Sequence, residues 1–552
     1  MLKDIYFKSI ITALTITLLF ASCQDVFWAE HYKLSPLNSD KTLMQEMESD
    51  TSLTRFVNIL KNTGYDKILN GSQTYTVWAP TNTALGSIIV QDTVAQFLKN
   101  HIARFPYSTA DLAQKGVIRV KMLNGKANTF LKNGNDFTFG DANVIAKDIV
   151  TQNGVLLKIN KYVPFFENIW EKVKSFSGND SISNYLYSFD KKVFDAANST
   201  ELGTSSKGIL YDSVFVYSNA WLSKFGRLNL EDSVYTMVVP NNAAWKTAYG
   251  TIKSYFKTYD KLSVDNGTTK TFKITGTLAD SLQRTYTCQA LTHDLAFRTK
   301  LTTIPADSLI STNKNVFHSP SHLFDNSVPV ETSNGLIYSS GSMSYLPTES
   351  WHKRIVVEAE NSAARTYNNA SVVDVVAKND QFIPYISGRK YTSLTPTGAS
   401  ANFQPELILN IPNTLSAAYD IYCVVVPKYE SDTSKTYFPT TKTYSFTDST
   451  MVSFQMTYVD ANGLMSAKTS ITKDPVTAKV YETSPTNVSK FLVAKGFKFP
   501  FANFTISPFT GVVIQTNTVT IKVKTNVSST DFTSGKYVRN LRVDCFILEP
   551  AN

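Results

Sequence analysis

The residue types that most often carry chemistry occur in this sequence at spacings that do not support it. His318 and His322 have the spacing of a helical zinc pair, but Pro320 between them prevents the helix that would align both rings. Gly203–Gly208 has the spacing of a phosphate-binding loop, yet Ile209 stands where that loop needs a lysine. The sequence has no nucleophile elbow, and a carboxylate pair for glycoside hydrolysis among its 45 acidic residues stays open. We therefore predict no enzyme, no metal site and no cofactor.

Composition narrows the class of protein further. The chain has 552 residues, of which 43% are hydrophobic and only 18% are charged, so it can bury several cores. Its net charge of +9 is spread without a basic block, so we do not expect a nucleic-acid partner. Four cysteines are too few for a disulfide-stapled scaffold. Cys423 and Cys545 lie in apolar runs and are either buried thiols or a disulfide.

The N-terminus has the layout of a secretory signal. Two lysines precede the apolar stretch Ile10–Ala21, which is too short to span a bilayer. The stretch leads into Leu19–Cys23, where small residues before a cysteine resemble the lipobox of bacterial lipoproteins. This resemblance implies that residues 1–22 are a signal peptide and that Cys23 carries the lipid anchor. The alternative is a plain cleaved signal with an incidental cysteine.

Residues 23–37 would then form a lipidated tether. Asp25, close behind the lipidated cysteine, resembles the export signal of surface-exposed lipoproteins in gut-type Gram-negative bacteria. We therefore expect a protein that is held at the outer membrane by its lipid and exposed on the cell surface.

One sequence unit occurs twice, at Tyr75–Asn82 and at Tyr235–Asn242. Each copy contains an apolar β-rich run that stops at a proline, Pro80 or Pro240. Polar caps and helix-forming residues follow each proline, so each box predicts a strand that leads directly into a helix.

Each unit also closes with an Asn-Gly pair before an apolar run, which predicts a tight turn and a strand. The stretch from Pro240 to Asn334 in the second unit is longer than the stretch from Pro80 to Asn153 in the first. The second unit therefore carries extra residues, which we place in the polar tract Asn313–Ser333.

These boxes resemble the fasciclin domain. The resemblance implies two α+β units, each a twisted β-wedge that carries helices, at residues 38–168 and, in degenerate form, at 176–348. It also implies extracellular adhesion through protein or glycan contact, without catalysis. The motif residues that we expect to be structural are Pro80, Thr81, Asn82, His101, Asn153, Gly154, Pro240, Asn242, His293, Asn334 and Gly335.

A helix is expected before the first box, because Thr42–Leu60 places its apolar residues at helical spacing. In the family, a Tyr-His pair is associated with receptor contact, but Asn100 and Thr292 stand in place of the tyrosine. We therefore expect His101 and His293 to be structural, each bonding a backbone group.

Residues 355–552 consist of short β-rich runs separated by polar turns. Seven such runs predict an all-β antiparallel sandwich. The last two, Val519–Lys524 and Leu541–Pro550, resemble the closing strands of galactose-binding-like jelly rolls, which implies a carbohydrate- or ligand-binding module. Sugars stack on aromatic faces, and the tyrosines in loop-like tracts that could supply them are Tyr385, Tyr391, Tyr429 and Tyr437. The alternative is that these tyrosines are half-buried packing residues.

Together these features predict a lipid-anchored binding or adhesion lipoprotein that is accessory to glycan or nutrient capture. The expected partners are a glycan or an envelope protein, with an outer-membrane transporter complex among the candidates. The alternative is a structural scaffold that binds other envelope proteins and no sugar.

Overall fold

The structure is a computed structural model that describes residues 40–551 outside a set of short gaps. The gaps are 87–93, 195–199, 206–207, 213–214, 266–268, 274–275, 326, 401, 432–435, 439–442, 446–447, 467–479 and 504–517. Two compact units are present, and the first ends at Ile169 and takes in Asn229–Val234 and Glu331–Asn334. Cys23 and the predicted signal and tether lie outside the described residues. None of the described helices is long and apolar enough to cross a membrane.

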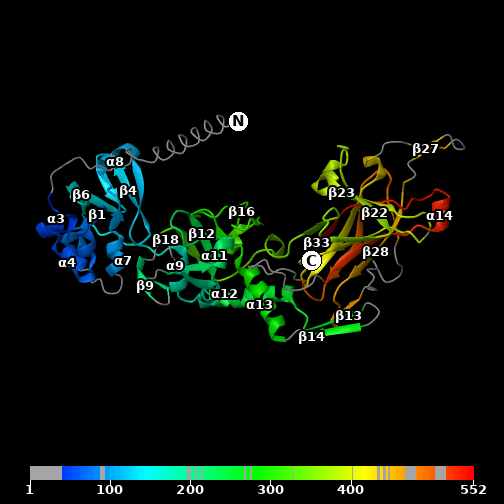
Figure 1. Ribbon diagram of the computed structural model, residues 1–552, viewed down its shortest axis with the longest axis horizontal. Helices are drawn as coiled ribbons and strands as arrows, with labels where there is room; N and C mark the ends of the chain where they lie inside the picture. Colours follow the sequence, from blue (N-terminus) through cyan, green and yellow to red (C-terminus); the bar gives the residue numbers. More distant parts are fainter. Residues whose placement is uncertain are drawn as a thin grey trace, which may run out of the picture. The chain divides into compact units, whose positions relative to one another are not determined.

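The first unit is α+β, with a seven-stranded sheet in the order β2-β1-β7-β6-β5-β4-β3 (Figure 1). Its strands are β1 (Tyr75–Pro80), β2 (Ile102–Arg104), β3 (Val117–Lys121), β4 (Ala127–Asn133), β5 (Asp136–Phe139), β6 (Ala142–Thr151) and β7 (Gly154–Ile159). Its helices are α3 (Leu43–Ser49), α4 (Thr54–Thr63), α5 (Tyr65–Leu69), α6 (Asn82–Leu85), α7 (Val94–Lys99) and α8 (Thr109–Lys115).

The helix expected over Thr42–Leu60 is present but divided. Thr42 caps α3, and the apolar residues of both α3 and α4 are buried, so the predicted buried face is confirmed. The single continuous helix is wrong. Asp50 adopts an extended backbone, and its side chain accepts a hydrogen bond from the Ser52 amide, which ends one helix and caps the following turn.

The second sequence repeat, residues 176–348 and hereafter called the second unit, contains a four-stranded sheet in the order β15-β12-β19-β18. Its strands are β12 (Tyr235–Pro240), β15 (Ala296–Phe297), β18 (Val328–Thr332) and β19 (Gly335–Ser340). The helices of this part are α9 (Ile169–Ser175), α10 (Asp180–Tyr187), α11 (Ala220–Phe225), α12 (Asn242–Lys253) and α13 (Gly276–Thr292). Strand pairs outside the sheet are β8 (Asp190–Phe194) with β11 (Phe215–Asn219), β9 (Thr200–Ser205) with β10 (Gly208–Asp212), and β16 (Leu309–Ile310) with β17 (Val316–Phe317). A further sheet has the order β14-β13-β29, with β13 (Lys261–Asp265), β14 (Thr269–Lys273) and β29 (Leu464–Ser466).

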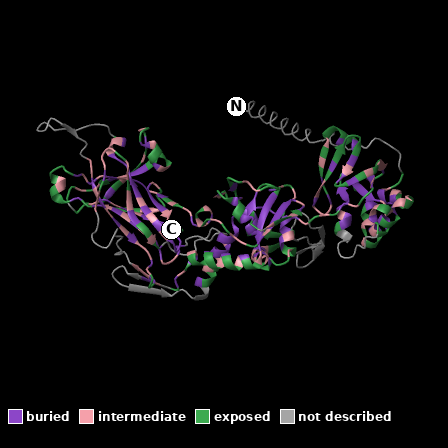
Figure 2. Ribbon diagram, turned by 180° about the vertical axis from the view of Figure 1, so that it is seen from behind, coloured by how far each residue is buried: buried purple, intermediate pink, exposed green. Residues whose placement is uncertain are grey.

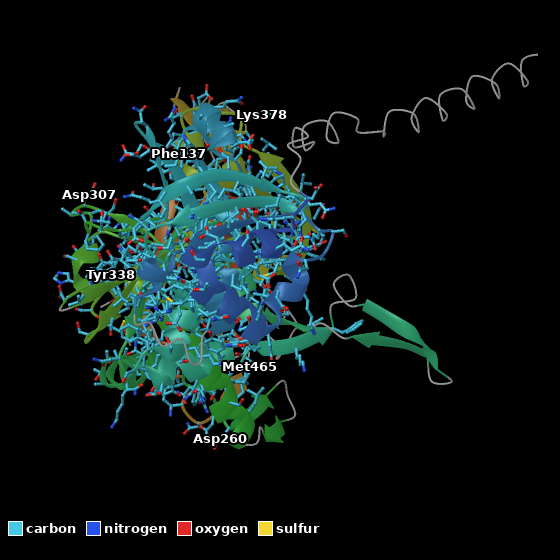
Figure 3. All side chains as sticks on the ribbon, turned by 90° about the vertical axis from the view of Figure 1, so that its left-hand side faces the viewer. Phe137, Asp260, Asp307, Tyr338, Lys378 and Met465 are labelled. Atoms are coloured by element: carbon cyan, nitrogen blue, oxygen red, sulfur yellow. The ribbon has the colours of Figure 1, made fainter. Side chains whose placement is uncertain are left out.

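The two boxes have the same strand register, which confirms the repeat. Tyr75 pairs with Gly154 in the parallel β1–β7 ladder, and Tyr235 pairs with Gly335 in the parallel β12–β19 ladder. Both prolines end their strands, and a helix starts two residues later, as predicted. Tyr338, which is labelled in Figure 3, lies on β19. Its ring packs edge-to-face on that of Phe324, and both side chains are buried.

The extra residues of the second unit lie elsewhere than expected. The antiparallel partner of Thr76 is Ala103, and the partner of Thr236 is Phe297. The stretch from the box to this partner strand is much longer in the second unit, whereas the stretch from the partner strand to the closing asparagine is shorter. The extra residues therefore precede β15, and their placement in Asn313–Ser333 is wrong. Spacing between motifs reports only the net difference, whereas the strand register locates it.

The C-terminal part is an antiparallel β-sandwich, and all seven predicted runs are strands. One sheet has the order β22-β23-β33-β25-β31 with β20 beside β33, and the other has β21-β24-β32-β28-β30. The strands are β20 (Ile355–Glu358), β21 (Arg365–Asn368), β22 (Ala370–Val376), β23 (Lys390–Pro396), β24 (Glu406–Asn410), β25 (Ala418–Val425), β28 (Met451–Thr457), β30 (Tyr481–Glu482), β31 (Ser489–Lys498), β32 (Thr520–Thr525) and β33 (Leu541–Pro550). Buried residues follow the strands, and exposed residues gather on helices and turns (Figure 2).

Candidate functional site

The asparagine side chains of the two closing Asn-Gly pairs hydrogen-bond to backbone groups of distant segments. The Asn153 side chain accepts a hydrogen bond from the Leu43 amide at 2.7 Å and donates to the carbonyls of Leu69 and Gly71 at 2.8 and 2.7 Å. Asn334 likewise accepts from the Ile169 amide at 2.8 Å. Because a buried amide with filled hydrogen bonds has nothing left to offer a ligand, both residues are structural.

Close backbone approach explains the glycines of these pairs. A Cβ on Gly154 would lie 2.0 Å from the carbonyl oxygen of Tyr75, and one on Gly335 would lie 1.8 Å from that of Tyr235. Both glycines have positive φ, at 155° and 148°. They begin the closing strands rather than form the turn, which in the first unit lies between Thr151 and Gly154. Only glycine allows the parallel strand to pair at that distance.

Polar residues after each proline tie the box to a neighbouring helix. Thr81 caps α6 by accepting from the Ala84 amide at 3.2 Å. Asn82 accepts from the Arg55 amide at 2.9 Å, and Asn242 accepts from the Ser181 amide at the same distance. These side chains therefore hold the start of α4 and of α10 against their boxes.

His101 is a neutral, fully buried histidine. Its Nδ1 lies 2.9 Å from the carbonyl oxygen of Phe97, so this nitrogen carries the hydrogen. Its Nε2 accepts a hydrogen bond from the Val163 amide at 3.0 Å, so this nitrogen does not. Desolvation by burial lowers the pKa of His101 to about 4. The ring thus connects α7 to the segment after β7, and it is not available to a partner.

His293 belongs to a buried polar cluster that the sequence does not reveal. Its Nδ1 lies 3.0 Å from the Gln289 carbonyl oxygen, its Nε2 lies 2.9 Å from Asp294 Oδ2, and Ser350 Oγ donates to the same oxygen at 2.5 Å. Burial by itself raises the pKa of Asp294, but hydrogen bonds from His293, Ser350 and Ser311 lower it to about 2. Ser350 Oγ lies 2.5 Å from Asp294 Oδ2 and 3.5 Å from His293 Nε2, so the hydroxyl donates to the carboxylate rather than to the ring, unlike a serine that a histidine activates.

The four candidate tyrosines of the sandwich have different environments. Tyr385 is 67% exposed and can present its ring to a ligand. Tyr391 is only 1% exposed and donates to Glu430, so its assignment as a ligand-binding residue is wrong. Tyr429 is half-buried and packs edge-to-face on Phe382. Tyr437 lies on β26 (Thr436–Phe438), and its side chain is outside the described part. Alternation along β23 turns Tyr391 inward, which its loop-like sequence context concealed.

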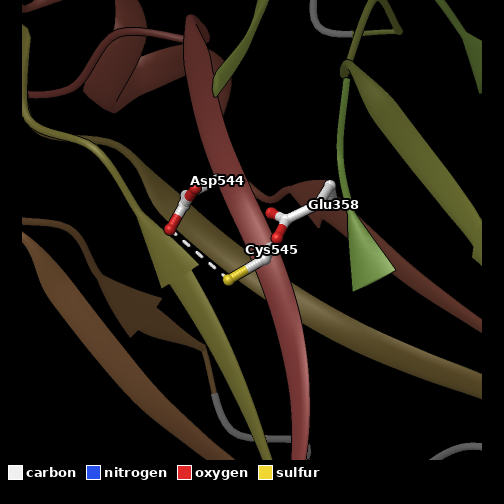
Figure 4. A group of neighbouring side chains, drawn as sticks. All are labelled: Glu358, Asp544 and Cys545. Carbon is white, nitrogen blue, oxygen red and sulfur yellow. Dashed lines mark hydrogen bonds between the residues drawn. The ribbon is translucent and has the colours of Figure 1, made fainter. Parts of the chain in front are cut away.

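A carboxylate cluster lies beside the last strand of the sandwich (Figure 4). Glu358 at the end of β20 and Asp544 on β33 each offer an oxygen, and Cys545 a sulfur, all within 4.8 Å of one another. Asp544 is 1% exposed, and Ser387 donates its amide to Oδ2 at 3.1 Å. Burial raises the pKa of Asp544 to about 7, and repulsion from Glu358 and Glu360 adds to this effect.

Unpaired oxygens of this cluster indicate what it can hold. Oδ1 of Asp544 and one oxygen of Glu358 are buried without a hydrogen-bond partner among the described residues. Buried unpaired carboxylates are costly unless a cation compensates them. Hard oxygen donors fit Ca²⁺, whereas burial keeps the Cys545 thiol protonated by raising its pKa, so sulfur is a poor ligand here. The predicted absence of a metal site is therefore not supported by this geometry.

Part of the first unit matches a known family. A family model described as the fasciclin domain matches residues 51–163. No curated protein matches the chain. The FAS1 domain pair of the insect cell adhesion molecule fasciclin I matches at 13% identity and a TM-score of 0.20, covering 54% of this chain and 98% of that one.

Two carbohydrate-binding modules from Clostridium thermocellum also match. The C-terminal family 22 module of Xyn10B has 12% identity and a TM-score of 0.20, covering 37% of this chain and 95% of its own. A family 35 module has 11% identity and a TM-score of 0.17, covering 36% of this chain and 99% of its own.

The pairing register of β25 with β33 shows whether the two sandwich cysteines can form a disulfide. Cys423 on β25 lies opposite Phe546 on β33, and Cys545 lies opposite Val424. Neighbouring residues on a strand point to opposite faces, so the two thiols lie on different sides of the sheet. Cys423 belongs to the sandwich core and Cys545 to a small cluster on the other face. Both are free and buried, so the disulfide alternative is wrong and the buried-thiol alternative holds.

The carboxylate cluster could not be found from motif spacing, although one signal was present in the sequence. Glu358 and Asp544 lie almost at opposite ends of the C-terminal part, so spacing could not join them. Asp544, however, interrupts the apolar run Val543–Leu548 of β33, in which every residue is buried. A charged residue in a strand that is buried throughout needs a compensating partner, and this makes such a position a candidate ligand.

Proposed function

We propose that this chain is a lipid-anchored surface protein that binds a glycan or an envelope protein and does not catalyse a reaction. The observation that carries the proposal is the fasciclin domain at residues 51–163, a domain type that serves adhesion. The second unit repeats its strand register with a tyrosine opposite each closing glycine, which supports two adhesion-type units in tandem.

The second part of the proposal concerns the lipid anchor, which would hold the protein at the membrane surface where glycans and envelope proteins are found. Lipidation of Cys23 would hold it at the outer membrane, accessory to glycan or nutrient capture and beside a transporter complex. The test is detergent phase partition of full-length protein made in a Gram-negative host. Wild type should enter the detergent phase, and the Cys23→Ala variant should remain in the aqueous phase. Equal partition of the two would refute the anchor.

We further propose that the carboxylate cluster holds Ca²⁺ and thereby stabilises the sandwich. Glu358 and Asp544 supply oxygen ligands, and their unpaired buried oxygens support this assignment. The cation would replace the proton that burial favours on Asp544. Calcium titration of the chelated protein should raise its melting temperature, and an Asp544→Asn variant should not respond.

Binding itself can be tested with a panel of host and dietary polysaccharides. Saturable binding by calorimetry that depends on the exposed ring of Tyr385 would place a glycan site on the sandwich. Multiple-turnover cleavage of any of these glycans by the purified protein would refute a purely binding function.

An envelope scaffold is the second candidate, and one surface of the first unit favours it. Val117 and Leu131 face each other across β3 and β4, and they are 53% and 38% exposed. Exposed apolar side chains on these strands can pack against a partner protein, and an exposed strand edge can pair with a partner's strand. A Val117→Lys variant that no longer retrieves envelope proteins from membranes, while glycan binding is unchanged, would favour this function.

A further inference from the structure

A groove of about 1060 Å³ lies between three helices of the second unit. These are α10, α12 and α13, and α12 contacts both of the others. Helices α12 and α13 are labelled next to each other in Figure 1. The volume is at the upper end of the range for clefts that hold small ligands. The groove shares none of its lining residues with the carboxylate cluster or the sandwich tyrosines.

The groove is lined in part by helices that are longer in the second unit than in the first. The helix that follows the box has four residues in the first unit, as α6, and twelve in the second, as α12. The longer stretch between Pro240 and β15 includes the whole of α12 and all 17 residues of α13. Two of the three walls, α12 and α13, thus lie in the stretch that is longer in the second unit, whereas α10 precedes the box.

Aromatic side chains line the groove in half-buried positions. Tyr185, Phe189, Trp245 and Tyr249 each keep part of their surface accessible. The Tyr185 ring centroid lies 5.2 Å from that of Phe189 and 5.9 Å from that of Trp245. A continuous aromatic wall of this kind suits the apolar faces of sugar rings, which stack on flat side chains.

Positive charge accompanies these rings. Lys246 on α12 and Arg284 on α13 are exposed and line the groove from different helices. None of the described lining residues is a carboxylate, and neither cation has an ion pair in the described part of the chain. The nearby carboxylates Asp180 and Asp280 lie outside the lining, and Asp180 accepts a hydrogen bond from Asn242. An anionic ligand would therefore find two cations to pair with and no repulsion from the walls.

We propose that this groove binds a short acidic oligosaccharide, one that carries uronate or sulfate groups. The rings of Trp245 and Tyr249 would stack on the sugars, and Lys246 and Arg284 would pair with the acidic groups. A single-stranded nucleic acid uses the same side-chain types, but it needs a long basic track, and the chain has no basic block. The inference rests on the proposed binding function and gives it a site and a ligand class.

The test uses the full-length lipidated protein in detergent, titrated calorimetrically with oligogalacturonate and, separately, with a neutral galacto-oligosaccharide of equal length. The main variant is Lys246→Gln with Arg284→Gln, because both side chains are exposed and glutamine removes their charge while it keeps a polar side chain. Lys253→Gln is the matched control, since Lys253 is an exposed cation of α12 outside the groove lining. Trp245→Leu, with circular dichroism to verify folding, tests the aromatic wall.

The expected result is saturable binding of the acidic oligosaccharide that weakens about tenfold or more in the double variant and in Trp245→Leu, but not in Lys253→Gln. Equal affinity for the neutral oligosaccharide would overturn the acidic ligand class. Binding that is lost in Tyr385→Ala and retained in Trp245→Leu would overturn the groove while the proposed function stands. No glycan binding by any form would overturn the groove site and the glycan branch of the proposed function, and would leave only binding to an envelope protein. If a single-stranded oligonucleotide binds and the same variants weaken it, the ligand class is a nucleic acid and the acidic-oligosaccharide proposal is overturned.

Discussion

Acidification should destabilise the fasciclin domain through one residue, His101. Its ring is 0% exposed, donates to the Phe97 carbonyl and accepts from the Val163 amide, so the folded domain requires the neutral form. Its pKa is about 4 in the folded domain, against 6.5 for an unperturbed histidine. Because the folded pKa is lowered, the stabilisation is fully present above pH 6.5 and is lost as the pH falls through 4.

The size of this effect follows from the two pKa values. Linkage gives a loss in the free energy of unfolding of about 2 kcal/mol at pH 5 and about 3 kcal/mol at pH 4, relative to pH 7.5. A His101→Gln variant has an amide that can donate to one backbone partner and accept from the other, but it does not titrate. It should be less stable at pH 7.5, and its stability should fall by about 3 kcal/mol less than that of wild type on going to pH 4.

Hydrogen exchange of the β1 peptide in a urea series measures this quantity in the full chain, because β1 lies within the affected sheet. His322→Gln serves as the control, since His322 is exposed and its replacement should leave the pH dependence of β1 unchanged. If wild type and His101→Gln lose the same stability between pH 7.5 and 4, the assignment of a buried neutral histidine is refuted.

Three further changes test other parts of the structure. Gly154→Ala should abolish cooperative urea unfolding of the first unit, because its Cβ would meet a carbonyl at 2.0 Å, whereas Gly64→Ala, with open space around it, should cost only about 1 kcal/mol. In EDTA, burial holds the pKa of Asp544 at about 7, above its usual 3.8, so the stabilisation that its protonated form provides is present below pH 3.8 and is lost as the pH rises through 7. Asp544→Asn should remove up to about 4 kcal/mol of that loss in urea melts. An unchanged slope of the free energy of unfolding against pH would contradict this. Cys423 and Cys545 should both react with a thiol reagent after denaturation without reductant, and a missing pair of thiols would show that they are bridged.

Local patterns predicted those parts of the fold that depend on local chemistry. A proline cannot continue a strand, and the polar residues after Pro80 and Pro240 cap helices, so both strand-to-helix boxes could be placed from the sequence. The seven sandwich strands and the buried face of α3 and α4 follow from side-chain periodicity in the same way. The fasciclin resemblance rested on these same boxes and is matched at residues 51–163.

Tertiary structure alone decided which distant residues meet. Strand register located the extra residues of the second unit, turned Tyr391 into the core and put Cys423 and Cys545 on opposite faces of one sheet. Pairing of β20 with β33 brought Glu358 to Asp544 from almost opposite ends of the sandwich sequence. Such encounters depend on register and packing, and a shift of one residue reverses which face a side chain occupies, so the separate strand patterns carry no information about them.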